Sequence, residues 1–292
     1  MATIPEPTYA DLRAAIKKEK ERRIAEHLAA MATRKRMMAA LAPGTLPTLN
    51  LLAQGDSWFE YPLPPGGSDV VAHLRRLPTM TPLVLQLAHH GETAEDMLGV
   101  AKLHELLAAL RNPEHGPWDA ILFSGGGNDL AGNQFRLWLA ETSSAGGAPA
   151  KGLNRKRLDA ILGVVRAGYE DLIAARTSVD PSIPIFAHGY DFAIPSNVGV
   201  CGAGPWLKPG LDDRGWTDPG KARAIVRQLL VAFDAMLSDF ERDKPNNFVY
   251  ARTQGTLSDA DWANELHPTP DGFAAVTAKF VDALRARFPG RI

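Results

Sequence analysis

Short apolar runs alternate with longer helical stretches from Leu46 onward, and this alternation limits the chain to few folds. The predicted strands are Leu49–Ala53, Leu83–Ala88, Ala120–Ser124, Ile183–Ala187 and Phe248–Ala251. The predicted helices are Asp69–Leu77, Thr93–Leu110, Arg155–Arg176, Pro219–Arg242 and Pro270–Phe288. Continuous apolar strands that alternate with helices are typical of a parallel sheet covered on both faces. Right-handed crossovers then predict an α/β protein, a flavodoxin-like three-layer α/β/α sandwich with a five-stranded parallel sheet.

A long charged helix precedes the alternating region. Tyr9–Leu41 carries apolar residues at helical spacing among many Lys, Arg and Glu residues, and Pro43 and Gly44 end it. We therefore predict an N-terminal helical extension at residues 1–45 and an α/β domain at residues 46–292. The extension is expected to pack on the α/β domain or on a second copy of the chain, which would form a homo-oligomer.

Composition narrows the classes of partner. The 292 residues include 32 Lys and Arg against 33 Asp and Glu. The chain therefore has no excess of positive charge that would attract the phosphate backbone of nucleic acid. A single cysteine, Cys201, cannot form an intrachain disulfide and favours a reducing, cytoplasmic location. No apolar run reaches the ~18 residues that span a membrane. Met1–Arg23 lacks the apolar core of a signal peptide.

Chemistry-bearing residues follow the predicted strands, where ligands bind in open α/β sheets. Ser57 follows the first strand in a Gly-Asp-Ser turn, and Gly91 follows the second. A glycine run follows the third strand and ends at Asn128, and His267 stands in the loop before the last helix. A serine hydroxyl is a nucleophile once a histidine takes its proton. Backbone N–H groups and a side-chain amide are donors that stabilise a developing oxyanion.

Other chemistries fit these residues less well. A dinucleotide-binding loop would need a glycine where Leu130 stands, and a Ser124 nucleophile elbow would need one where Leu122 stands. His89 and His90 are adjacent and are expected to point in different directions, so we predict no metal site. We also predict no organic cofactor.

The order of these segments resembles the SGNH (GDSL) hydrolase family over about Leu46 to Phe288. The matching blocks read Gly55-Asp56-Ser57, Gly91, Gly126-Gly127-Asn128-Asp129 and Asn264-Glu265-Leu266-His267. The resemblance implies an α/β/α esterase, lipase or carbohydrate deacetylase without a cofactor. It implies that Ser57 is the nucleophile and His267 the base. It also implies an oxyanion hole made by the N–H groups of Ser57 and Gly91 and the side chain of Asn128.

One position departs from the family pattern. The family has Asp three residues before the catalytic histidine, and this chain has Asn264. An aspartate there would fix the histidine tautomer and stabilise its charged form. Three interpretations stay open: the Asn264 oxygen orients His267, another carboxylate (Asp261 or Glu265) does so, or the protein is an attenuated or inactive ligand-binding descendant.

The expected substrate is a small ester with a short acyl group, or an O-acetylated saccharide. Trp58, directly after the nucleophile, is a candidate for substrate contact. Trp206 and Trp216 are further candidates, because they lie on the long glycine- and proline-rich segment Ala193–Trp216. That segment is interpreted either as the wall of a pocket or as a plain surface insertion.

Overall fold

The computed structural model describes residues 9–42, 44–61, 68–200 and 203–292. Cys201, on which the prediction of a reducing compartment rests, lies outside these residues. In the described part of the chain, no helix combines the length and apolar character needed to cross a membrane.

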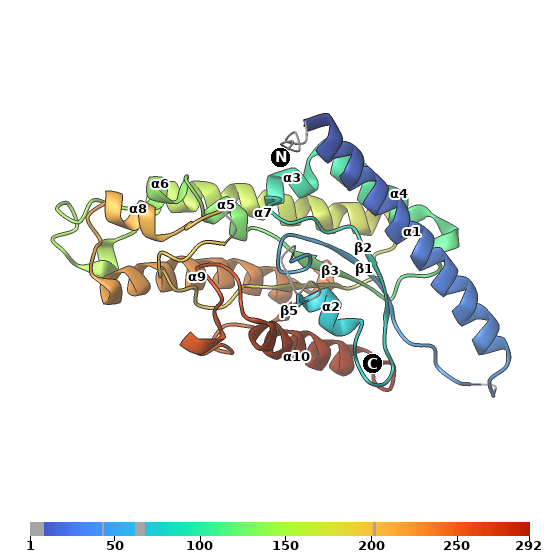
Figure 1. The fold of residues 1–292 in the computed structure, drawn as a ribbon. Helices are drawn as coiled ribbons and strands as arrows, with labels where there is room; N and C mark the ends of the chain where they lie inside the picture. The colour runs from blue at the N-terminus through green and yellow to red at the C-terminus, as the bar shows by residue number, and fades with distance from the viewer. Residues whose placement is uncertain (1–8, 43, 62–67, 201–202) are drawn as a thin grey trace, which may run out of the picture.

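The central sheet contains five parallel strands in the order β2-β1-β3-β4-β5 (Figure 1). The strands are β1 (Asn50–Gly55), β2 (Leu83–Gln86), β3 (Ala120–Ser124), β4 (Ile185–His188) and β5 (Phe248–Ala251). The chain runs from β1 outward to β2 and then crosses back to β3, so the strand order switches between β1 and β3. Gly55 of β1 pairs with Ser124 of β3 at this point. The predicted flavodoxin-like α/β fold is confirmed.

Helices cover both faces of the sheet, with α4 and α7 on one side and α2 and α10 on the other (Figure 1). Every residue of β1, β3 and β4 is buried between these layers. The helices after β1 are α2 (Val70–Leu74), α3 (Ala94–Leu98), α4 (Val100–Arg111), α5 (Gly127–Leu130), α6 (Phe135–Trp138), α7 (Arg155–Val179), α8 (Lys208–Asp213), α9 (Pro219–Arg242) and α10 (Pro270–Arg287).

Several predicted elements have different bounds in the structure, and two of them differ in a way that matters for the fold or the site. The predicted helix Thr93–Leu110 is divided into α3 and α4, because Gly99 has an extended backbone with ψ of 156°. The predicted strand Ile183–Ala187 begins later, after Pro184, and continues to His188. This shift places His188 at the carboxyl end of β4, beside the other polar residues that follow the strands.

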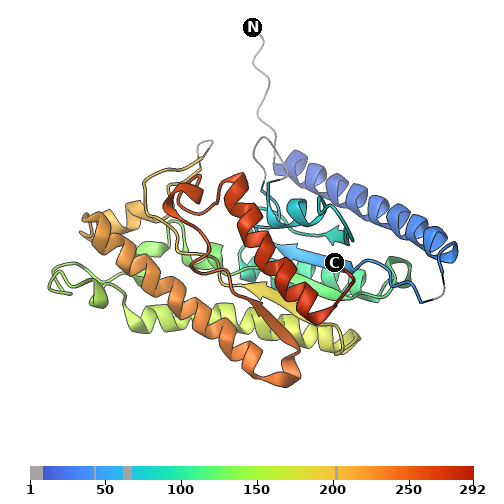
Figure 2. The same cartoon turned by 90° about the horizontal axis from the view of Figure 1, so that it is seen from below.

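The N-terminal helix α1 (Tyr9–Ala39) lies along the side of the α/β domain next to β2 (Figure 2). Arg23 donates to the carbonyl oxygen of Ala88 at 3.0 Å. The ring of His27 stacks on Trp118 with 5.4 Å between centroids. The extension therefore packs on the α/β domain, and its contact with a second copy of the chain stays a prediction.

Candidate active site

Ser57 stands in a tight turn directly after β1. Asp56 organises this turn, because its Oδ1 accepts the N–H of Trp58 at 3.0 Å and its carbonyl oxygen accepts the N–H of Phe59 at 3.0 Å. Gly55 has no room for a side chain, since a Cβ there would lie 2.8 Å from the Cβ of Ser124. The sequence Gly-Asp-Ser therefore places the Ser57 hydroxyl at the carboxyl edge of the sheet.

His267 reaches Ser57 across the sheet edge from the loop before α10. Its Nε2 lies 2.7 Å from the Oγ of Ser57. Both residues are buried. Burial lowers the pKa of His267 to about 4, and repulsion from His90 adds to this effect. The ring is therefore neutral near pH 7, which is the state in which an imidazole accepts a proton.

Asn264 takes the orienting position, and its side-chain oxygen faces the histidine. Nδ1 of His267 lies 2.9 Å from Oδ1 of Asn264. The same Oδ1 accepts the backbone N–H groups of Leu266 and His267, each at 3.0 Å. Because two fixed donors point at this atom, it must be the oxygen and not the nitrogen of the amide. Nδ1 of His267 therefore carries its proton, and Nε2 is left to accept the proton of Ser57.

The two other carboxylates near the histidine in sequence are engaged elsewhere. Asp261 accepts the N–H and the hydroxyl of Ser258 at the start of a short 3-10 turn. Glu265 is fully buried and accepts four backbone N–H groups, at 2.6–3.1 Å, from Asn197, Trp206, Leu207 and Lys208. The interpretation in which another carboxylate orients His267 is therefore wrong. Glu265 instead holds in place, by hydrogen bonds, the segment that carries Trp206.

The structure brings the predicted oxyanion donors to the same cavity as Ser57 and His267. This cavity has a volume of about 300 Å³ and is also lined by Gly91 and Asn128. Nδ2 of Asn128 donates one hydrogen to the carbonyl oxygen of Glu92 at 2.8 Å, which fixes the amide and leaves its second N–H. Gly91 has φ of +79°, a backbone conformation that favours glycine, and nothing lies within 4 Å of where a Cβ would be.

The three tryptophans predicted to contact substrate have different positions. Trp206 lines the 300 Å³ cavity, and its ring centroid lies 5.6 Å from that of His267. Trp58 is buried, donates its indole N–H to Leu266 and lines only a smaller cavity. Trp216 is 1% exposed and donates to the carbonyl oxygen of Ala140 at 2.8 Å. Trp216 lines neither cavity and is a core residue, so the prediction for it is wrong.

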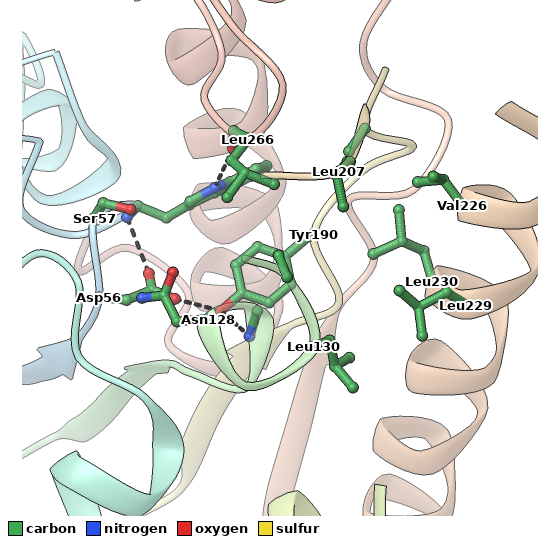
Figure 3. Close-up of a pocket in the computed structure, with 14 residues that line it drawn as sticks. Asp56, Ser57, Asn128, Leu130, Tyr190, Leu207, Val226, Leu229, Leu230 and Leu266 are labelled. Atoms are coloured by element: carbon green, nitrogen blue, oxygen red, sulfur yellow. Dashed lines mark hydrogen bonds between the residues drawn. The ribbon is translucent and has the colours of Figure 1, made fainter. Parts of the chain in front are cut away.

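A smaller cavity, of about 50 Å³, also borders Ser57, and Figure 3 shows the residues that line it. Its wall includes Asn128 and Tyr190 near the serine and a group of aliphatic side chains farther away. The aliphatic residues lining it are Leu130, Ala131, Ala193, Leu207, Val226, Leu229, Leu230 and Leu266. The segment Ala193–Trp216 contributes to the walls of both cavities, which supports the interpretation of it as a pocket wall.

A buried polar network that the sequence did not reveal lies beneath the nucleophile. The backbone N–H of Tyr190 donates to Nδ1 of His188 at 3.3 Å, so the proton of that ring is on Nε2. Nε2 donates to the Oγ of Ser124 at 2.8 Å, and Ser124 donates to Asp56 at 2.7 Å. The Oγ of Ser124 thus accepts a hydrogen bond from the histidine ring. A nucleophilic serine would instead donate its hydroxyl hydrogen to the histidine. It is also fully buried, so this second Ser-His-Asp cluster has no nucleophilic serine.

This network fixes the turn that carries Ser57. The hydroxyl of Tyr190 donates to the second oxygen of Asp56 at 2.5 Å and accepts the N–H of Gly127 at 3.1 Å. Burial raises the pKa of Asp56 to about 6 despite these donors. Burial lowers the pKa of His188 to about 3. The network therefore joins the ends of β1, β3 and β4 through neutral and charge-assisted hydrogen bonds.

One group of metal-ligand residues occurs among the residues that the structure describes: Glu60, His89 and His90, whose ligand atoms lie within 4.8 Å of one another. The two rings are stacked with 4.4 Å between centroids, so the expectation that adjacent histidines point apart is wrong here. Glu60 already pairs with the guanidinium of Arg23 at 2.5 Å and accepts the backbone N–H of His90. This carboxylate is therefore neutralised by its own neighbours.

No protein-family model matches the chain, and no curated protein matches it. Three solved structures of similar fold are an extracellular lipase from Streptomyces rimosus, a carbohydrate esterase of family 3 from Talaromyces cellulolyticus and phospholipase A1 from Streptomyces albidoflavus. Their sequence identities are 16%, 14% and 15%, and their TM-scores are 0.44, 0.45 and 0.45. Each match covers 82% of this chain and 98–99% of the other.

Proposed function

We propose that the protein is a serine hydrolase that cleaves a carboxylic ester, with Ser57 as nucleophile and His267 as base. The observation that carries this proposal is the hydrogen-bonded series Ser57–His267–Asn264. The distances of 2.7 and 2.9 Å are those of a nucleophile, a base and an orienting group. The two backbone donors on Asn264 Oδ1 support the tautomer that a general base requires.

In the proposed acylation step, Oγ of Ser57 attacks the carbonyl carbon of the ester, and its proton moves to Nε2 of His267. The carbonyl oxygen becomes an oxyanion and accepts hydrogen bonds from the N–H groups of Ser57 and Gly91 and from Asn128. The bond between the carbonyl carbon and the alcohol oxygen then breaks. The proton on Nε2 passes to the leaving alkoxide, and an acyl-Ser57 intermediate remains.

Deacylation repeats these transfers with water. Water takes the place of the departed alcohol and gives a proton to Nε2 of His267 as its oxygen attacks the acyl carbon. The bond from that carbon to Ser57 Oγ breaks, and Oγ regains the proton from His267. The products are a carboxylic acid and the free enzyme, and no group from outside the chain other than water is consumed.

Asn264 is expected to permit this chemistry at a reduced rate. An amide oxygen orients the imidazole but carries no charge that stabilises the imidazolium formed in each step. In a serine protease triad, replacing Asp by Asn lowered kcat by about 10⁴, chiefly because the ring adopted the wrong tautomer. Here the ring has the useful tautomer, so the loss should be smaller than that value.

The test is hydrolysis of a short aryl ester combined with labelling by a serine-reactive fluorophosphonate. We expect the unchanged protein to turn over the ester and to be labelled on Ser57. Ser57→Ala should lose both, with turnover falling by about 10³ or more. Ser144→Ala is the matched control, because it removes the same hydroxyl from an exposed position that lines neither cavity, and it should leave turnover and labelling at Ser57 unchanged.

A second candidate function is ligand binding without catalysis, which the missing charge at Asn264 favours. It predicts no turnover and no labelling in the unchanged protein and in Asn264→Asp, with circular dichroism that shows intact folding. Small esters and O-acetylated saccharides are the substrates to try first, because the 300 Å³ cavity has room for a small alcohol or a single sugar ring. Turnover of any of these that depends on Ser57 would contradict the binding-only alternative.

A further inference from the structure

Two cavities meet at the candidate nucleophile, and most of the residues that line each cavity are not shared with the other. Ser57, Asn128 and Leu266 line both, so an ester whose carbonyl is held at Ser57 would extend one part into each cavity. An ester has two parts, the acyl chain and the alcohol. Only the alcohol takes a proton from His267 as it leaves, and the acyl chain stays bonded to Ser57. The residues that line only one cavity therefore indicate which part each cavity holds.

The wider cavity suits the alcohol. His267 lines this cavity and does not line the smaller one. The leaving alkoxide takes its proton from Nε2 of His267, so the alcohol must be on the same side of Ser57 as that ring. Gly91 also lines only the wider cavity. The acyl chain must then extend away from His267, towards the smaller cavity.

The smaller cavity has the chemistry of an apolar chain. Leucines and a valine from α9 and from the segment after β4 form its far end (Figure 3). Apart from Ser57 and Asn128, the polar side chains in its wall hydrogen-bond to neighbouring protein groups: the Tyr190 hydroxyl donates to Asp56 and accepts from the N–H of Gly127. The Trp58 indole donates to the carbonyl oxygen of Leu266. A hydroxylated acyl group would find few partners there, whereas an alkyl chain would bury its surface.

We propose that the 50 Å³ cavity binds the acyl chain, and that Leu229 on α9 and Ala193 after β4 limit its length to about four carbons. This inference rests on the proposed function. Each water-sized group needs about 15 Å³ of cavity volume. The 50 Å³ of the smaller cavity therefore holds roughly three carbons beyond the carbonyl carbon. The substrate class is then an ester of a short, unbranched alkanoic acid, with the butanoyl group as the preferred acyl part.

The test measures kcat/KM for esters of one alcohol whose acyl chains have two, four, six and eight carbons. The unchanged protein should prefer the four-carbon chain. Leu229→Ala removes carbons from the cavity wall and should raise the ratio of octanoyl to butanoyl hydrolysis by about tenfold or more. Ala193→Leu adds carbons from a half-buried position and should lower the ratio of butanoyl to acetyl hydrolysis by about the same factor.

The matched control is Leu237→Ala, which removes the same atoms from a buried position of α9 that does not line the cavity. Its chain-length profile should equal that of the unchanged protein. A second series that varies only the alcohol should be unaffected by Leu229→Ala and Ala193→Leu. Opposite shifts in the two cavity variants cannot come from a general loss of stability.

The outcomes separate the two proposals. One outcome is ester hydrolysis that depends on Ser57, with the same acyl preference in Leu229→Ala, Ala193→Leu and Leu237→Ala. This outcome would overturn the acyl-cavity proposal and leave the hydrolase proposal standing. A change in alcohol preference, and not in acyl preference, would place the alcohol in the smaller cavity and would also overturn it. The absence of hydrolysis and of labelling in every protein would instead overturn the hydrolase.

Discussion

In the proposed mechanism, a single oxygen atom, Oδ1 of Asn264, orients His267. It accepts three N–H groups, two from the backbone and one from the ring. An aspartate carboxylate would accept the same three donors, so the loop geometry is compatible with either residue. The difference between Asn and Asp at this position is therefore mainly one of charge, and not of ring orientation.

Replacing Asn264 by Asp should increase the rate and change its dependence on pH. A carboxylate stabilises the imidazolium, so we expect kcat to rise on the order of tenfold to 10²-fold. It also favours the charged ring, so the pKa of His267 should rise from about 4. His267 acts as base only when neutral. The acidic limb of kcat/KM should therefore lie near pH 4 in the unchanged protein and at higher pH in the variant.

The measurement is kcat/KM for an aryl ester from pH 3.5 to 8, with circular dichroism at each pH to verify folding. Asn133→Asp, at an exposed position, is the control for an added surface charge and should leave the limb in place. An acidic limb that stays at the same pH in Asn264→Asp would show that residue 264 does not act on the charge of His267.

At the scale of elements, the segment between β4 and α9 is fixed to the active-site loop by Glu265. This carboxylate accepts the N–H groups of Trp206 and Leu207 at 2.6 Å each, and these two residues line the two different cavities. Glu265 follows Asn264 directly, so one short sequence positions the base on one side and the pocket wall on the other. If the proposed function holds, this coupling gives Glu265, which does not contact Ser57 or His267 in the described hydrogen bonds, an influence on substrate binding.

Glu265→Gln should loosen the pocket wall and leave the nucleophile in place. Each carboxylate oxygen accepts two of the four N–H groups and an amide nitrogen accepts none, so two of the donors would lose their partner. We expect the free energy of unfolding to fall by about 3 kcal/mol and KM to rise more than kcat falls. Urea unfolding and steady-state kinetics would check this, with the exposed Glu114→Gln as control. An unchanged KM together with a large loss of kcat would contradict the positioning role.

The sequence predicted the strands well because their apolar runs are continuous and are followed by glycine turns. It also indicated that Ser57, Gly91, Asn128 and His267 lie together, because each follows a strand or precedes the last helix, and all four line one cavity. It missed what depends on tertiary packing. Trp216 lies on a glycine-rich segment that resembles a loop, yet its indole is buried against Ala140. His188 was overlooked because no spacing in the sequence relates it to Ser124 and Asp56.

At the scale of the whole molecule, buried ionisable groups should make stability depend on pH between 7 and 5. Burial lowers the pKa of His27 to about 4, of His188 to about 3 and of His267 to about 4. The unfolded chain therefore binds more protons than the folded one as the pH falls below about 6.5, so stability is lost. Asp56 acts in the opposite sense, because its pKa is raised to about 6 and the folded state takes up its proton first.

The net change follows from these signs. Each histidine removes about 2 kcal/mol between pH 7 and pH 5, and Asp56 returns about 1 kcal/mol. We expect the free energy of unfolding to fall by about 5 kcal/mol, as measured by urea denaturation at the two pH values. Asp56→Asn removes the stabilisation that comes from protonation of Asp56. The free energy of unfolding should therefore fall by about 1 kcal/mol more in this variant between pH 7 and pH 5. A fall that is equal or smaller in this variant would show that Asp56 is already ionised in the folded protein at pH 5, and that the network beneath Ser57 is built on a charged carboxylate.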